Sequence, residues 1–177
     1  MTRKSASQQL TEEAAASDDD QTFSVFLSHC LADAELIWGV KQLLEEQGET
    51  VYVDWIVDRQ LDRANVTSKT ADTLRQRMRQ SQSMIFATST SSPDSKWMPW
   101  ELGYFDGLRQ GQVAVLPLIQ SDGGGFTGQE YLGLYPLVER LLTQSGDERI
   151  YVTLGAGSRV YAEMKDFRSG KQPYKAY

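Results

Sequence analysis

Short apolar runs alternate with amphipathic stretches along most of this chain, between two polar ends. Five runs rich in β-branched and aromatic residues predict strands over 22–28, 50–55, 83–88, 112–119 and 149–154. The run at 83–88 shows no alternation, which is typical of a parallel strand buried on both faces. The stretches between and after the strands predict helices over 33–47, 67–80, 97–109, 131–142 and 158–167.

Strands that alternate with helices predict an α/β fold, a parallel sheet with helices on both faces. Gly48 follows one predicted helix at the position where a C′ glycine ends it. The polar composition of residues 1–21 predicts a disordered or loosely helical tail, and 169–177 reads as a flexible one. We therefore expect one domain over 22–168.

A ligand site is expected at one edge of this sheet, because parallel sheets bind ligands beyond the carboxyl ends of their strands. The loops at that edge begin at Ser28, Asp54, Ser89 and Gln120. The segment SPDSKWMPWELGYFDG (92–107) comes just after the third of them. It places the carboxylate of Glu101 beside Trp97, Trp100 and Tyr104, which favours this edge as the site.

Glu101 falls in the first turn of the helix predicted over 97–109. In one interpretation it only complements the helix dipole. In the other it is a catalytic carboxylate that stabilises an oxocarbenium-like centre or orients a ribose hydroxyl. The dipole argument does not separate the two. Trp97 and Trp100 both precede Glu101 and are three residues apart, which is a helical spacing. We expect one to pack in the core and the other to border the site.

The polar residues at the ends of the first two predicted strands have simpler alternatives. His29 and Cys30 are adjacent, and adjacent side chains rarely face each other, which disfavours a Cys–His nucleophile. One histidine and one cysteine also give no basis for a metal site. Asp54 and Trp55 form either an Asx turn or one wall of a pocket. Ser28 and His29 are more readily binding or shaping residues.

Composition excludes several classes of protein. A net charge of −6 gives no general electrostatic attraction to nucleic acid. A single cysteine allows no intrachain disulfide. No apolar run approaches the roughly 20 residues that span a bilayer, and the first residues lack the apolar core of a signal peptide. The glycines at 123–125 match no phosphate-binding fingerprint. We expect a cytoplasmic protein that binds neither nucleic acid nor a membrane.

Five segments, in this order, resemble Toll/interleukin receptor (TIR) domains, above all the bacterial ones. They are FSVFLSH (23–29), VYVDW (51–55), SMIFATS (83–89), SKWMPWEL (95–102) and VAVLPLI (113–119). The W-x-x-x-E pattern from Trp97 to Glu101 is the most specific, and the likeness spans about 22–155. The resemblance implies a flavodoxin-like three-layer sandwich with a five-stranded parallel sheet.

The resemblance also implies an activity. Many bacterial TIR domains cleave NAD at the nicotinamide–ribose bond with the glutamate of this motif, here Glu101. NAD is then the substrate, with no permanently bound cofactor and no metal. The product is an ADP-ribose-derived signal, cyclic or conjugated, that reaches a separate effector in anti-phage defence, and family members assemble as homo-oligomers. The residues expected to bind substrate are Ser28, His29, Asp54, Trp55, Ser89, Trp97 and Trp100.

Two other functions stay open at this point. A non-enzymatic TIR module would act by TIR–TIR assembly, and Glu101 would then be an ordinary helix-terminal residue. A flavodoxin-like receiver or flavin domain fits less well. A receiver needs acidic residues after its first strand and an aspartate at the end of its third, whereas these strands end in SHC and ATS.

Overall fold

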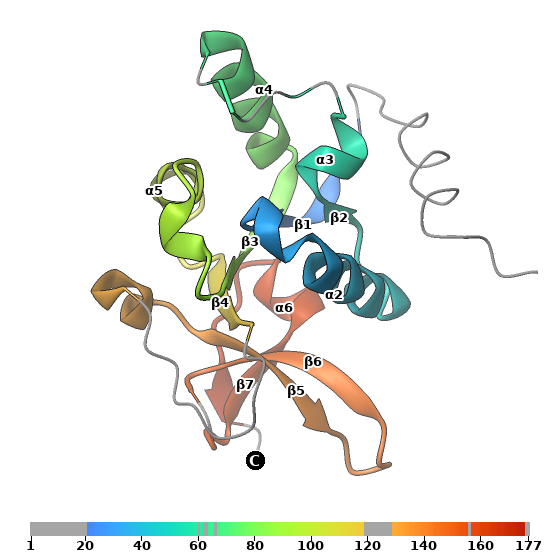
Figure 1. Cartoon of the computed structure of the whole chain (residues 1–177). Coiled ribbons are helices and arrows are strands. Elements are labelled where there is room, and N and C mark those ends of the chain that lie inside the picture. The colour runs from blue at the N-terminus through green and yellow to red at the C-terminus, as the bar shows by residue number, and fades with distance from the viewer. Residues whose placement is uncertain are drawn as a thin grey trace, which may run out of the picture.

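The computed structural model describes residues 21–59, 61, 64–65, 67–118, 129–155 and 157–175. These residues form an α/β structure on one mixed eight-stranded sheet, in the order β2-β1-β3-β4-β5-β6-β7-β8 (Figure 1). Apart from Gln21, the predicted N-terminal tail lies outside the described residues, as do Gln120 and the glycines at 123–125. The division of the chain into tails and one domain stays a prediction.

The first half of the sheet is parallel. It contains β1 (Phe23–Ser28), β2 (Val51–Tyr52), β3 (Ser81–Thr88), β4 (Val113–Pro117) and β5 (Leu137–Leu142). Parallel pairs join β1 to β2 and β3, and join β4 to β3 and β5. The strands predicted over 22–28, 83–88 and 112–119 are confirmed here, and the strand predicted over 149–154 is confirmed in the other half of the sheet. The strand β4 ends at Pro117, which cannot donate to the next ladder bond.

The second predicted strand is shorter than expected. The backbone turns after Val53, whose carbonyl accepts hydrogen bonds from Ile56 N at 3.1 Å and Val57 N at 3.0 Å. Residues Asp54–Val57 therefore form the short helix α3. The prediction that Asp54 and Trp55 end a strand is wrong, because both lie in this helical turn.

The second half of the sheet is antiparallel and corrects two predictions. Its strands β6 (Glu148–Thr153), β7 (Val160–Glu163) and β8 (Tyr174–Lys175) follow β5 in antiparallel pairs. The helix predicted over 131–142 is wrong, since a 3₁₀ helix, η3 (Glu130–Leu134), leads into β5. The helix predicted over 158–167 is reduced to α6 (Met164–Phe167). The expected five-stranded, wholly parallel flavodoxin-like sheet is not confirmed.

Residues 137–142 form a strand, where a helix was predicted, because they pair with a neighbouring strand. The apolar spacing of 137–142 suits one helical face, but these six residues pair in register with β6 over its whole length. Strand propensity depends on such cross-strand neighbours more than on the local sequence. Pro136, just before the strand, also disfavours helical backbone at the residue that precedes it.

The other helix predictions are confirmed within a residue or two. The helices are α2 (Ala34–Glu46) after η1 (Leu31–Asp33), α4 (Ser68–Arg79), and α5 (Met98–Leu108) after η2 (Ser92–Asp94). Gly48 follows α2 with a φ of +87°, a left-handed conformation that glycine adopts without strain. Thr67 caps α4, since its Oγ1 accepts from Thr70 N at 3.1 Å. None of the described helices is long and apolar enough to cross a bilayer.

The sheet separates two hydrophobic clusters, as the alternation of β1 requires. Val25 and Leu27 contribute to a cluster that includes side chains from α2, α3 and α6. Phe26 contributes to the other, which includes side chains from α4 and α5. Figure 1 shows α4 and α5 on one side of β1 and β3, and α2 on the other. The parallel half of the sheet is thus the middle of three layers.

A buried ion pair connects the segment after β2 to α4. Arg77 Nε and Nη2 each donate to a carboxylate oxygen of Asp58 at 2.9 Å. The Tyr52 hydroxyl donates to Asp58 Oδ2 at 2.8 Å, and all three side chains are buried. Burial, together with the negative charges of Asp58 and Asp54, raises the pKa of Tyr52 well above its usual value. The network sets where α3 ends relative to α4.

We predict that Arg77→Met destabilises the protein by about 3–5 kcal/mol, because it leaves the Asp58 carboxylate buried without its cation. Chemical denaturation followed by circular dichroism measures this. Arg79→Met is the control, since Arg79 is exposed on the same helix and its replacement should cost within about 0.5 kcal/mol. The double variant Arg77→Met/Asp58→Leu should recover part of the loss. Equal stability of Arg77→Met and Arg79→Met would contradict the prediction.

Candidate active site

The carboxylate of Glu101 lies buried at the carboxyl end of β1. Ser28, the last residue of β1, donates a hydrogen bond from Oγ to Glu101 Oε2 at 2.6 Å. Glu101 is 0% exposed and Ser28 is 1% exposed. Two residues 73 positions apart in the sequence therefore meet at the predicted edge of the sheet.

Local sequence explains why Glu101 stands in the first turn of α5. Pro99 fits there because the first helical residues have no intrahelical acceptor for their N–H groups. Glu101 N then donates to the Trp97 carbonyl at 2.8 Å, which closes the first turn. The positive end of the helix dipole favours a negative side chain at this position. A carboxylate held at this position is suited to stabilising a positive centre.

His29 continues from β1 and is 2% exposed. Its Nδ1 lies 2.8 Å from the Leu27 carbonyl oxygen, and Trp55 Nε1 lies 2.9 Å from its Nε2. A carbonyl only accepts and an indole N–H only donates, so these partners assign a neutral ring with its proton on Nδ1. Asp54 Oδ1 is 3.5 Å from the same Nε2. The structure thus brings three of the predicted site residues into one group.

Ser89 belongs to a second pair at this edge. Its Oγ donates to Asp33 Oδ2 at 2.6 Å and accepts from Ser91 N at 3.0 Å. Asp33 is 8% exposed and ends η1, so this bond connects the loop after β1 to the loop after β3. Sequence reasoning missed Asp33. Its signal was an acidic residue in the loop that follows Ser28, at the same edge of the sheet.

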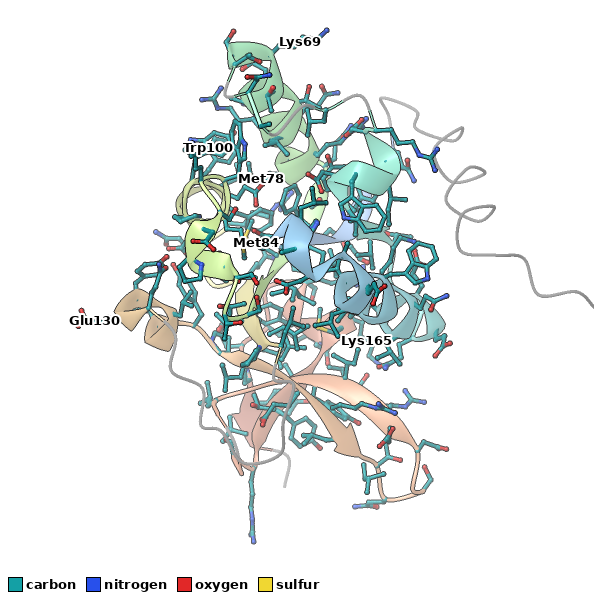
Figure 2. All side chains as sticks on the ribbon, in the orientation of Figure 1. Lys69, Met78, Met84, Trp100, Glu130 and Lys165 are labelled. Carbon is teal, nitrogen blue, oxygen red and sulfur yellow. The ribbon has the colours of Figure 1, made fainter. Side chains whose placement is uncertain are left out.

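The two tryptophans of α5 have different surroundings. Trp97 is buried, packs with side chains of the α4–α5 layer, and meets Trp100 edge to face at 5.4 Å. Trp100 is half-buried, and Figure 2 shows it beside α4. Its ring stacks on Tyr104 at 5.8 Å and lies 5.3 Å from the Arg75 guanidinium carbon. Trp100 therefore faces the contact between α4 and α5.

The arrangement suits chemistry at a positive centre. One buried carboxylate, held by a hydroxyl donor and placed at a helix N-terminus, can stabilise a developing cation. In the described part of the chain no three histidine, cysteine or acidic side chains come together as metal ligands. The expectation that no metal takes part stays a prediction.

Comparison with known proteins identifies the class. The chain is 48% identical over 137 residues to a probable 3′ cyclic ADP-D-ribose synthase, ThsB′, of Bacillus cereus (strain MSX-D12), covering 76% of this chain and 70% of that protein. It is 29% identical over 85 residues to a putative cyclic ADP-D-ribose synthase, TIR2, of Cytobacillus dafuensis, covering 48% of this chain and 22% of that protein. No protein-family model matches the sequence.

The chain belongs to the bacterial TIR-domain family that includes these synthases. This confirms the resemblance found in the sequence. The roles of Glu101 and of the seven residues expected to bind substrate stay predictions at this point.

A stability measurement separates the two interpretations of Glu101. We predict that Glu101→Gln leaves the free energy of unfolding unchanged or raises it by about 1 kcal/mol, because the amide still accepts from Ser28 and no charge is buried. Urea denaturation measures this. Asp58→Asn is the control, since it breaks a structural ion pair and should lose stability. A large loss in Glu101→Gln would mean that the carboxylate serves the fold.

Proposed function

We propose that this protein cleaves NAD at the nicotinamide–ribose bond and closes the ADP-ribose into a ring, making a signal for anti-phage defence. The single observation that carries the proposal is the buried Glu101 carboxylate, bonded to Ser28 at the ligand edge of the sheet. Membership of the family of cyclic ADP-ribose synthases supports it. We further propose that the five parallel strands, in the order β2-β1-β3-β4-β5, correspond to a flavodoxin-like unit.

Bond cleavage places a positive charge that Glu101 is suited to meet. The C1′–N bond breaks, nicotinamide leaves as a neutral molecule with the bonding electron pair, and the ribosyl group becomes an oxocarbenium-like cation. In the proposed mechanism the Glu101 carboxylate stabilises that cation. Ser28 holds one carboxylate oxygen in place, so the group needs little reorganisation as the charge develops.

Ring closure decides the product. A hydroxyl of the second ribose, or a nitrogen of the adenine, attacks C1′ and gives a cyclic product; a hydroxyl loses its proton in this step. Water attacking the same carbon gives linear ADP-ribose. A site that excludes water favours the ring. We propose that Trp55, which packs against one hydrophobic cluster, and Trp97, which belongs to the other, border the site from the two sides of the sheet. Trp100 stabilises the contact between α4 and α5.

The buried state of Glu101 supports one more part of the proposal. A carboxylate with 0% exposure is reached by substrate only after neighbouring side chains move. We propose that several copies of the chain assemble and stabilise the opened site, and that the cyclic product diffuses to a separate effector. The cytoplasmic location expected from the sequence belongs to the same proposal.

The first test follows NAD turnover. We expect the purified protein to release nicotinamide, seen by chromatography, and a product 18 mass units lighter than ADP-ribose, since ring closure replaces addition of one water (about 18 Da). Specific activity, the turnover per amount of protein, should rise with protein concentration, since it depends on assembly. Absence of nicotinamide at every concentration, with or without a phage-derived trigger, would contradict the proposal and favour a non-enzymatic interaction module.

The second test assigns the carboxylate. We predict that Glu101→Gln lowers kcat by about 10²–10³, the usual cost of removing one electrostatic stabiliser of a transition state. Glu35→Gln is the matched control, because Glu35 also lies in the first turn of a helix but is exposed. We expect it to retain normal turnover. Full activity in Glu101→Gln would remove this residue from the mechanism.

The third test concerns Ser28. We predict that Ser28→Ala lowers kcat by about 10-fold or more with little change in KM, because it removes a hydrogen bond to a charged group. Ser28→Thr keeps the hydroxyl and should restore most of the rate. Ser24→Ala on the same strand is the control, since it also removes a buried hydroxyl, one bonded to the Thr50 carbonyl. Equal effects of the two alanine variants would show a purely structural role.

A further inference from the structure

Both ring nitrogens of His29 are already engaged inside the protein. Nδ1 donates to the Leu27 carbonyl at 2.8 Å, and Nε2 accepts from Trp55 Nε1 at 2.9 Å. The side chain is 2% exposed. A ring in this state has neither a free proton nor a free lone pair for a substrate. This differs from the substrate-binding role that the sequence suggested.

The orientation of the Trp55 indole depends on a polar contact. It lies in α3, a helix of only four residues, and is partly buried against the cluster that contains β1 side chains. Apolar packing places no acceptor opposite the indole N–H, so it does not satisfy that donor. The hydrogen bond to His29 fixes the direction of the N–H. The two rings meet at 73°, with centroids 6.5 Å apart, so the indole edge approaches the imidazole edge-on.

Asp54 also lies beside the nitrogen of His29 that accepts from Trp55. Its Oδ1 is 3.5 Å from the Nε2 that accepts from Trp55. A proton on that nitrogen would remove the lone pair that holds the indole. The bond to the Leu27 carbonyl keeps the proton on Nδ1 and leaves Nε2 for Trp55.

We infer that His29 is a positioning residue: its neutral imidazole holds Trp55 in the orientation in which the indole meets NAD. The carbonyl of Leu27 selects the tautomer, and the tautomer selects the orientation of Trp55. Only the contact between Trp55 and NAD rests on the proposed function. The tautomer and the hydrogen bond are properties of the free protein and are tested without substrate.

The first experiment is nitrogen-15 NMR of the full chain without ligand. His29 is the only histidine, so its ring signals need no assignment, and Trp55→Phe identifies the Trp55 indole signal among four. We expect a neutral ring protonated on Nδ1 and an indole N–H protected from exchange with water. A proton on Nε2, or an indole N–H that exchanges freely, overturns the inference.

The second experiment is kinetic and uses NAD as the probe. We expect His29→Leu to raise KM about tenfold with a much smaller effect on kcat, the value of one hydrogen bond. His29→Gln keeps a carbonyl acceptor and should recover most of the affinity. In a Trp55→Phe background, which has no indole N–H, His29→Leu should add nothing further. Independent, multiplicative effects of the two substitutions overturn the inference.

Controls keep the outcomes distinct. Trp38→Phe is the matched control for Trp55→Phe, because Trp38 is also half-buried and packs against the same cluster. It should leave KM unchanged. If His29→Leu does not fold, the NMR result and the KM of His29→Gln decide whether the inference stands. Full activity of Glu101→Gln would contradict the proposed function but would not bear on the hydrogen bond between His29 and Trp55. If Glu101→Gln is inactive, the proposed function stands. If Trp55→Phe then has an unchanged KM, Trp55 does not contact NAD, and only the positioning role of His29 is overturned.

Discussion

A carboxylate with no exposure to water needs a hydrogen-bond donor, and in this protein the end of a β-strand supplies it. The bond from Ser28 to Glu101 joins β1 to α5 across the carboxyl edge of the sheet. It depends on the position of the whole strand, because β1 pairs on both sides, with β2 and with β3. Any change in that register would move Ser28 away from Glu101.

The loops at this edge are held to one another by polar side chains. Ser89 bonds to Asp33, which connects the loop after β3 to the loop after β1. His29 bonds to Trp55, which connects the end of β1 to α3. The ion pair of Asp58 with Arg77 then fixes the end of α3 against α4. Because each of these three loops has a partner on another element, the candidate site is built by the sheet and its surrounding helices together.

Much of the parallel half of the fold could be predicted from the sequence. The strands β1, β3 and β4 and the helices α2, α4 and α5 have strong local patterns, and Gly48 ends α2 as expected. The sheet edge proposed for the site followed from the position of residues 92–107 after β3. The second half was predicted less well. Residues 137–142 have a pattern that fits a helix, and only their pairing with β6 makes them a strand.

The sequence by itself determined the α/β class, the edge of the sheet proposed for the site, and the first-turn position of Glu101, because these depend on local periodicity and on chain order. The tertiary structure alone decided which side chains meet. Ser28 with Glu101, Ser89 with Asp33, and His29 with Trp55 are pairs between residues at least 26 positions apart. Hydrogen bonds need donor and acceptor within about 3 Å, and no local pattern encodes that distance. Only the packed sheet and its helices place these atoms so close together.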